Sequence, residues 1–328
     1  TTTAANLAAG IAAEGHRVLL MEADPQGGLA ESLVKDGTAA RGLGELLRGW
    51  AGAQETMTQS SVEGLDLLPA GQVDTDLEDQ LQRAARKDPF VLRQLIEELN
   101  GGHDVVIIDT PAGMGHLTRA CLAAANSYLI PLQPEELGYR TLPRVLAVAD
   151  EVKETLNPEL ECEGILLTMV DLRTRIARKV VNQLYENYGD RIMVSMIPRT
   201  IRMQEMSERA RPLIVHAPNS RGALAYAEVS REILLHGPGD PHAEADAIHD
   251  IAVSPDGGLA AIAVKRSPLR LLDLRSWRLR ELGRADEAIS RVTFGPQSRT
   301  LITASDERVL KRWDLATGGA RLIGTQQG

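Results

Sequence analysis

Short apolar runs separated by helical patterns fill the first 235 residues, and this alternation constrains the fold more than any other feature. The runs lie at residues 17–21, 65–68, 105–108, 128–130 and 165–167, and helical patterns of ten or more residues separate most of them. Continuous apolar strands between helices are typical of a parallel sheet that is covered on both faces. The sequence therefore predicts a doubly wound, mostly parallel α/β domain over residues 1–235.

The composition is that of a soluble globular protein, with 43% hydrophobic and 25% charged residues in a chain of 328, long enough for two domains. The net charge of −9 argues against a general polyanion binder but leaves room for a local basic face. Cys121 and Cys162 lie in apolar patterns without metal-site spacing, so we expect both to be reduced core residues. Neither a membrane-spanning run nor a signal pattern is present, which favours a cytoplasmic location.

The pattern changes near residue 236, where the breaker-rich stretch His-Gly-Pro-Gly-Asp-Pro begins a linker that we place at 236–248. A repeat of 41 residues follows: AVSPDG at 252–257 recurs as TFGPQS at 293–298, and RLLDL at 270–274 recurs as KRWDL at 311–315. This period is typical of a β-propeller blade of four short strands, and the second copy resembles the WD-repeat signature. We predict two WD-like blades over 249–328, an incomplete propeller because closure needs about four.

Two segments in the α/β part carry the pattern of a nucleotide site. A phosphate-binding loop is followed by Ser or Thr at the start of a helix, where the hydroxyl ligates Mg²⁺. Thr1 and Thr2 stand before a helical pattern and fit that place, although threonine also serves as a simple helix cap. The apolar run 105–108 ends in Asp109, at the sheet edge where a Mg²⁺ carboxylate belongs.

The stretch TTTAANLAAGIAAEGHRVLLMEADPQG closely resembles the first segment of the ParA/Soj-type ATPases, a deviant-Walker-A group that includes MinD and the nitrogenase iron protein. HDVVIIDTP at 103–111 resembles the family's Walker B and switch II segment, and similarity continues through 127–152, 164–180, 196–206 and 217–234. In this family a Lys-Gly-Gly-x-Gly-Lys loop stands just before the threonines. The resemblance therefore implies a chain truncated before the P-loop.

The resemblance implies ATP and Mg²⁺ as cofactors, with Thr1 and Asp109 as metal ligands and Asp24 as the residue that positions the attacking water. It also implies that Gly113 and Gly115 allow the backbone to approach the γ-phosphate, and that the adenine pocket falls around 168–171 and 197–198. The cofactor-binding residues implied in this way are Thr1, Thr2, Pro25, Gly113, Gly115, Met169 and Pro198. The chain departs from the family at Glu22, which replaces the usual Asp, and at Ala112, which replaces the second proline.

A cluster of basic residues between 173 and 221 gives a candidate DNA surface, because sequence-independent DNA binding needs clustered cations and no base readout. The alternative is a solvated helix face paired with Glu186 and Glu205. We favour Arg199, Arg202 and Arg221, which lie in segments that match the family. ParA-type proteins bind nucleoid DNA in this way as ATP-bound dimers.

The family resemblance thus implies an ATPase switch for chromosome or plasmid partitioning or cargo positioning on non-specific DNA. Its implied partners are a second copy in an ATP-dependent homodimer, a ParB-like stimulating protein and a protein partner for the propeller, in a nucleoid-associated, bacterial-type setting. Residues 1–328 lack the glycine loop and its lysines, so we expect negligible ATPase activity from this span alone.

Three alternatives remain beside this interpretation. A MinD-type membrane role is disfavoured because the helical pattern at 222–235 runs into Gly237-Pro238 without a basic amphipathic continuation. An iron-protein role is disfavoured because Cys121 lacks flanking glycines. A non-catalytic scaffold, in which a degenerate α/β module and a propeller dock protein partners, is the rival class; the retention of Thr1, Asp24 and Asp109 favours the ATPase.

Overall fold

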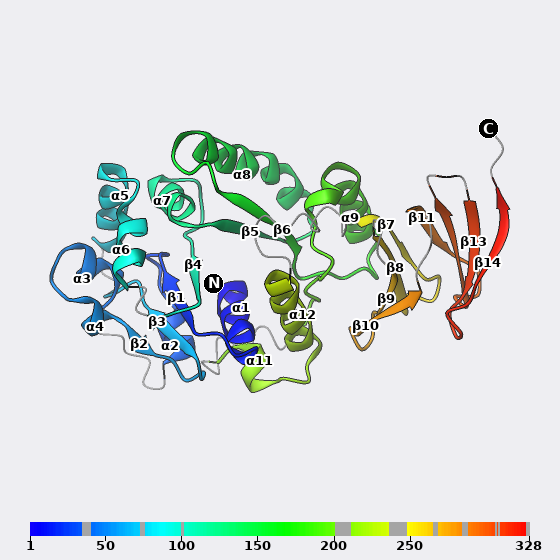
Figure 1. The fold of residues 1–328 in the computed structure, drawn as a ribbon, viewed down its shortest axis with the longest axis horizontal. Helices are drawn as coiled ribbons and strands as arrows, with labels where there is room; N and C mark the ends of the chain where they lie inside the picture. The colour runs from blue at the N-terminus through cyan, green and yellow to red at the C-terminus, as the bar shows by residue number, and fades with distance from the viewer. Residues whose placement is uncertain are drawn as a thin grey trace. The chain divides into compact units, whose positions relative to one another are not determined.

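A computed structural model describes residues 1–34, 41–72, 76–99, 102–200, 211–235, 248–264, 268–283, 288–305, 307 and 309–325. The chain, drawn in Figure 1, forms two compact units, each assembled from separate stretches of sequence. The first unit contains Thr1–Tyr128, Thr141–Cys162 and Thr200–Pro238; the second contains Leu129–Arg140, Glu163–Arg199 and Gly239–Gly328. Nearly all of the linker expected at 236–248 lies outside the described residues, and the domain boundaries drawn from the sequence stay predictions.

A four-stranded sheet forms the centre of the first unit. Its order is β2 (Thr58–Gln59), β3 (Leu65–Leu68), β1 (Val18–Glu22) and β4 (Val105–Asp109). β1 runs parallel to both β3 and β4, and only the short β2 is antiparallel to its neighbour. Every residue of β1 is buried, as its continuous apolar run predicts for a central parallel strand.

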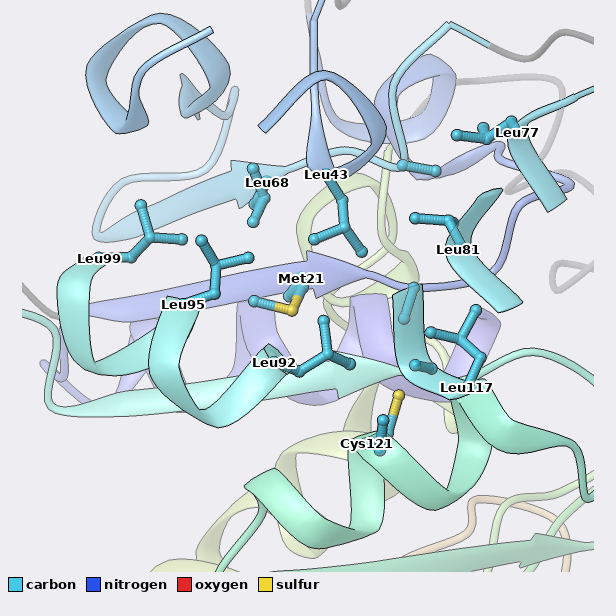
Figure 2. Close-up of a cluster of buried hydrophobic side chains, with 14 of the residues drawn as sticks. Met21, Leu43, Leu68, Leu77, Leu81, Leu92, Leu95, Leu99, Leu117 and Cys121 are labelled. Carbon is cyan, nitrogen blue, oxygen red and sulfur yellow. The ribbon is translucent and has the colours of Figure 1, made fainter. Parts of the chain in front are cut away.

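Helices cover both faces of this sheet. On one face Leu19 and Met21 of β1 pack into a leucine-rich cluster with α5 (Leu77–Lys87), α6 (Val91–Leu99) and α7 (His116–Ala124), as Figure 2 shows around Met21. Successive strand residues point to opposite faces, so the residues between them face the other side, where α1 (Thr2–Ala13) packs against the sheet. The predicted doubly wound arrangement is confirmed in this unit.

The C-terminal end of the first unit packs against α1. α11 (Leu213–His216) and α12 (Arg221–Leu235) both contact this helix. Arg231 of α12 forms an ion pair with Glu14, with 2.9 Å between its Nε and the carboxylate Oε1. Gly15, at φ +96°, ends the first helical segment as the sequence predicts.

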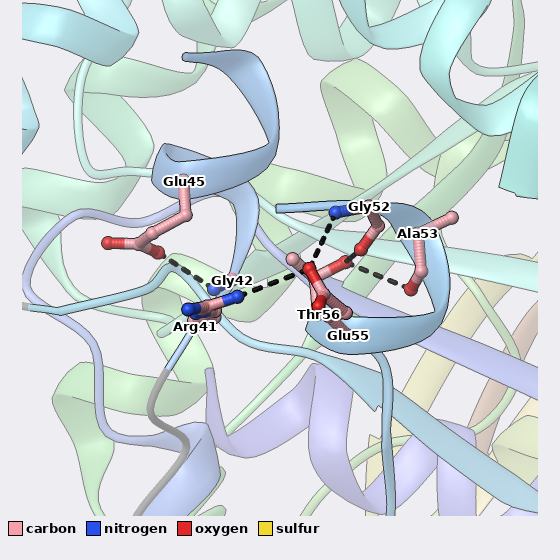
Figure 3. Close-up of polar contacts among 7 residues, drawn as sticks. All are labelled: Arg41, Gly42, Glu45, Gly52, Ala53, Glu55 and Thr56. Atoms are coloured by element: carbon pink, nitrogen blue, oxygen red, sulfur yellow. Dashed lines mark hydrogen bonds and ion pairs between the residues drawn. The ribbon is translucent and has the colours of Figure 1, made fainter. Parts of the chain in front are cut away.

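Three short helices follow β1: α2 (Leu29–Leu33), α3 (Leu43–Leu47) and α4 (Ala53–Thr56). A glutamate in the first turn of α3 and of α4 accepts a backbone N–H at the start of the same helix (Figure 3). Gly42 N–H donates to Glu45 Oε2 at 2.8 Å, and Gly52 N–H donates to Glu55 Oε2 at 3.1 Å. These contacts satisfy donors that a helix start otherwise leaves open.

The remaining α/β elements are β5 (Ser127–Leu132), α8 (Glu136–Thr155), β6 (Glu161–Leu167), α9 (Arg175–Tyr188) and the 3₁₀ turn η1 (Gly189–Arg191). The predicted strands at 128–130 and 165–167 are confirmed. Among the described residues, however, β5 and β6 pair in a two-stranded sheet of their own instead of extending the central sheet. β4 therefore has one hydrogen-bonded neighbour there, and its first four residues are only half-buried.

The C-terminal repeat folds as two antiparallel meanders (Figure 1). The first meander contains β7 (Ile248–Val253), β8 (Leu259–Val264), β9 (Leu269–Asp273) and β10 (Leu279–Gly283). The second contains β11 (Ile289–Phe294), β12 (Thr300–Ser305), β13 (Val309–Asp314) and β14 (Ala320–Thr325). Each strand pairs with its neighbour in the chain, so the predicted four short strands per repeat are confirmed. Closure into a propeller stays a prediction.

The two meanders share one apolar core, to which both contribute. Its buried residues are Ala261, Ala263, Leu269, Leu271, Leu282, Ile289, Val292, Leu301, Trp313 and Leu315. The Trp313 indole N–H donates to Thr303 Oγ1 at 2.9 Å inside this core. Asp250 of β7 accepts the Val292 N–H of β11 at 2.8 Å, so a polar contact joins the meanders as well.

Candidate functional site

The carboxyl ends of β1 and β4 bring the predicted metal and water-positioning residues to one edge of the sheet. Asp24 follows β1, Asp109 ends β4, and the parallel register places Glu22 opposite Asp109. Ala23 N–H donates to the Asp109 carbonyl at 2.9 Å, which fixes the two strand ends side by side. The backbone nitrogen of Thr1 lies 2.7 Å from Asp109 Oδ1. Thr1, Asp24 and Asp109 are thus brought together, as carboxyl-edge sites in α/β sheets generally are.

The donor set at this edge fits Mg²⁺. Asp109 is 5% exposed, and its Oδ2 is buried without a hydrogen-bond partner. A buried, unpartnered carboxylate oxygen is costly, and carboxylate and hydroxyl oxygens are the ligands that a hard cation prefers. Thr1 is the N-cap residue of α1, yet its side chain makes no capping hydrogen bond. The simple helix-cap alternative for Thr1 is therefore not supported by the geometry.

A tight turn holds Asp24 at the edge. Its Oδ1 accepts the Gln26 N–H at 3.0 Å, and its carbonyl accepts the Gly27 N–H at 3.1 Å. Pro25 is buried, and Gly27 and Gly28 adopt φ of +69° and +116°, which favour glycine. The sequence Asp-Pro-Gln-Gly-Gly therefore encodes a turn in which the half-buried Asp24 carboxylate has a defined direction.

Glu22 has a role that the sequence pattern does not reveal. Its carboxylate is 2% exposed; Oε1 accepts the Leu29 N–H at 2.7 Å and Oε2 accepts the Ala70 N–H at 3.2 Å. Burial raises the pKa of this carboxyl, and the two backbone hydrogen bonds oppose that rise. Both oxygens of Glu22 thus join the turn after β1 to the loop after β3.

The two predicted glycines lie between β4 and α7. Gly113 is exposed with φ +114°, and a Cβ at this position would meet no atom within 4 Å. Gly115 is the N-cap residue of α7, and its carbonyl accepts the Arg119 N–H at 3.1 Å. The backbone at Gly113 is therefore open to a bound group, in line with the predicted phosphate contact.

Met169 and Pro198, the predicted adenine-pocket residues, lie on adjacent segments of the second unit. Val170 and Pro198 form a parallel bridge, with Val170 N–H donating to the Ile197 carbonyl at 2.9 Å. Met169 adopts φ +53°, an uncommon conformation for a residue with a side chain. The structure brings these two segments together, while Thr1, Asp24 and Asp109 belong to the first unit.

The predicted DNA-contacting arginines are described only in part. Arg199 is exposed in the second unit, Arg221 is exposed at the start of α12 in the first unit, and Arg202 lies outside the described residues. Arg173, from the same basic cluster, makes a two-pronged contact with Asp171, both N···O distances being 2.8 Å. This contact holds the pKa of Asp171 below its ordinary value, so the charge of Arg173 is paired.

Two further residues support the start of α1. Tyr226 Oη of α12 lies 3.2 Å from Thr3 Oγ1, and burial raises the pKa of this tyrosine to about 12. Asn6 Oδ1 accepts the Ile214 N–H at 3.3 Å, and its Nδ2 donates to the Thr2 carbonyl at 2.9 Å. No local signal identifies the Tyr226–Thr3 and Ile214–Asn6 contacts, because in each of them the partners lie more than 200 residues apart in the chain.

Comparison with known proteins gives a consistent family. A family model described as an AAA domain matches residues 1–162. The chromosome partitioning protein ParA of Caulobacter vibrioides is 33% identical over 237 residues, covering 71% of this chain and 88% of that protein. The sporulation initiation inhibitor protein Soj of Bacillus subtilis is 32% identical over 242 residues, covering 72% and 94%.

A solved structure agrees with this result. Cobyrinic acid a,c-diamide synthase from Mycobacterium smegmatis, with a bound ATP analog and magnesium, matches with a TM-score of 0.60 and 31% identity, covering 72% of this chain and 88% of that one. Among the described residues, none of the helices is both long and apolar enough to cross a membrane. The edge geometry, the family match and these relatives lead to one conclusion: the chain belongs to the ParA/Soj family and has the α/β fold of the ParA/MinD-like P-loop ATPases.

Proposed function

We propose that this protein is a Mg-ATP-dependent, dimerising ATPase switch that partitions a chromosome or plasmid, or positions cargo, on non-specific DNA. The observation that carries the proposal is the convergence of Thr1, Asp24 and Asp109 at the carboxyl edge of β1 and β4, where Asp109 Oδ2 has no partner. The relative from Caulobacter vibrioides, which is named as a chromosome partitioning protein, supports the biological role.

The proposed chemistry is hydrolysis of the γ-phosphate by in-line attack of water. Asp24 orients this water with the carboxylate that the Gln26 N–H anchors. Asp109 and the Thr1 hydroxyl would hold Mg²⁺, which, when bound, offsets negative charge on the phosphates. Gly113, with open space beside its α-carbon, leaves the backbone accessible to the phosphate end of the nucleotide. Glu22 keeps the Asp24 turn in register with the neighbouring loop.

The Asp24→Ala substitution tests this proposal, in a chain that carries the family's Lys-Gly-Gly-x-Gly-Lys loop ahead of Thr1. We expect ATP hydrolysis to fall by about 100-fold or more, because water positioning contributes on that order, while ATP binding is retained. Asp104→Asn is the matched control: Asp104 stands at the opposite end of β4, where it binds Arg17, and its change leaves hydrolysis intact. If hydrolysis is absent before the substitution, or the same after it, the non-catalytic scaffold becomes the better description.

DNA binding belongs to the same proposal. Arg199 and Arg221 are exposed and lie in segments that resemble the family, and Arg202 completes the proposed set. If these arginines contact phosphates, the DNA affinity falls steeply as the salt concentration rises. The slope of log affinity against log salt concentration is proportional to the number of phosphates neutralised. Binding to mixed-sequence duplexes that is insensitive to salt, or no binding by the ATP-bound dimer, contradicts this part of the proposal.

For the two meanders we propose a WD-type interaction module that docks a protein partner, with a ParB-like stimulating protein acting on the ATPase part. Support comes from β14, where Leu322 and Ile323 are 58% and 48% exposed. Exposed apolar side chains on a strand at the edge of a sheet are typical of an edge that another chain can cover. The double substitution Leu322→Asp/Ile323→Asp is expected to abolish partner binding while leaving ATP hydrolysis unchanged.

A further inference from the structure

The first meander is packed directly against α/β residues of the second unit. Its strand β7 contacts α9 and η1. The turn between β9 and β10 places Trp277 in a buried position, with 7% of the residue exposed. The Trp277 indole N–H donates to the Met196 carbonyl at 2.8 Å. The first meander thus makes a buried, directional contact with the segment that precedes Pro198.

Trp277 occupies a backbone position that favours glycine. In both meanders this turn begins with an aspartate and closes with the same backbone hydrogen bond: Trp277 N–H donates to the Asp273 carbonyl, and Gly318 N–H donates to the Asp314 carbonyl. The closing residue has φ +60° at Trp277 and φ +71° at Gly318. A bulky side chain is strained in this region and glycine is not. The strained Trp277 provides the contact with Met196, which a glycine at this position could not make.

The segment after Met196 is held on its other side by the loop after β6. Ile197 N–H donates to the Leu167 carbonyl at 2.8 Å, and Arg199 N–H donates to the Val170 carbonyl at 3.0 Å. Val170 N–H returns a bond to the Ile197 carbonyl. Residues 196–199 therefore lie between two supports, the 167–170 loop and the Trp277 side chain.

We propose that Trp277 is a positioning residue for residues 196–199, through which the first meander fixes the wall of the adenine pocket. This inference rests on the proposed function and on the family resemblance, because it takes Met169 and Pro198, where that resemblance places the adenine pocket, to border the base. Trp277 does not touch the nucleotide in this scheme. It acts through the Met196 carbonyl, so that loosening the meander contact weakens recognition of the base and leaves the hydrolytic edge at Asp24 unaltered.

The first test needs no nucleotide and uses residues 1–328. Amide hydrogen exchange is measured in Trp277→Gly, which introduces the residue of the second meander, and in Trp277→Phe, which keeps an aromatic ring without the N–H. We expect the Ile197 and Arg199 amides to exchange about tenfold faster in Trp277→Gly, and less so in Trp277→Phe, as the loss of a buried hydrogen bond predicts. Amides of β13 are the internal reference, and Trp50→Phe, at an exposed tryptophan, is the control. Unchanged exchange at 197 and 199 in both folded variants overturns the inference.

The second test separates this inference from the proposed function. In the chain that carries the family's loop, Trp277→Phe is expected to raise the KM for ATP by about tenfold, to leave kcat within about twofold, and to reduce the preference for ATP over GTP. A loss of folded protein alone would lower the apparent kcat and would leave both KM and base preference unchanged. Faster exchange with unchanged KM and base preference overturns the assignment of Met169 and Pro198 to the base, and the nucleotide role of Trp277 with it.

Discussion

The two meanders repeat the same backbone conformation, yet they differ in residue type at positions that contact another part of the chain. Gly257 and Ser298 occupy one equivalent turn with φ of +68° and +55°, and Trp277 and Gly318 occupy the other. Asp273 and Asp314 each accept two backbone N–H groups at the start of the second turn. Conformation is therefore conserved between the repeats where residue type is not.

The differences follow what each meander packs against. In the first, the turn residue Trp277 reaches the Met196 carbonyl. In the second, Gly318 lies so close to the first meander that a Cβ there would be 2.6 Å from the Leu282 carbonyl oxygen. A position at which the two repeats differ in residue type therefore indicates a tertiary contact. A position at which they share the residue type indicates a requirement of the turn itself.

The largest effect is expected at Trp313, which lies in the shared core. At the equivalent position of the repeat, the first meander has Leu272. Trp313 is 1% exposed, and Trp313→Ala would remove its packing and its bond to Thr303. We expect the free energy of unfolding to fall by about 3–5 kcal/mol, measured by urea denaturation. Trp50→Ala, at a residue that is 67% exposed, is the control and should change little. Equal effects at Trp313 and Trp50 would break the description of a shared core.

A smaller effect separates the two glycine turns. Gly257→Ala adds backbone strain alone, because a Cβ there meets no atom within 4 Å. Its expected cost is about 1 kcal/mol. Gly318→Ala adds the clash with the Leu282 carbonyl to a similar strain, so we expect roughly 2–3 kcal/mol. If the two substitutions have the same cost in thermal unfolding, the close approach of the meanders at Gly318 is contradicted.

The smallest expected effect is on the pH dependence of stability at Asp314. The Thr317 backbone N–H, and then its hydroxyl, hold the pKa of Asp314 below its ordinary value of 3.8. A carboxyl with a lowered pKa contributes stability above its unfolded-state pKa, and this is lost as the pH falls through its folded-state pKa. Asp314→Asn keeps an acceptor oxygen but cannot titrate. Its deficit in the urea midpoint relative to the parent is therefore expected to narrow between about pH 7 and about pH 3. A deficit that stays constant would show that the charge of Asp314 is not involved.

The strands and the candidate site at the edge of the sheet could be predicted from sequence because their signals are local. A continuous apolar run predicts a buried strand, and an aspartate directly after it lies at the carboxyl edge. Asp24 and Asp109 follow this rule, and the parallel register of β1 and β4 brings them together. The two meanders were predictable from their repeat for the same reason, since one set of turn residues recurs.

The contacts that join distant segments could not be predicted in this way. Glu22 binds backbone groups 7 and 48 residues away, and Trp277 binds one 81 residues away. The sequence around each of these residues does not signal the contact, because a glutamate at a strand end and a tryptophan in a turn are both common. Only tertiary packing selects the partner. The separation of β5 and β6 from the central sheet, in the part of the chain that the structure describes, likewise depends on pairing, which periodicity does not encode.

The Trp277–Met196 contact has a consequence for how such a chain evolves. A gene that lost the codons for both meanders would remove the indole N–H and leave the Met196 carbonyl without its donor. It would also expose to water the residues of α9 and η1 that contact β7. A shortened descendant would then need compensating substitutions along residues 175–197 before it folded well. Loss of the meanders is therefore expected to lower the stability of the α/β part. For this reason, lineages that carry the meanders are expected to keep them.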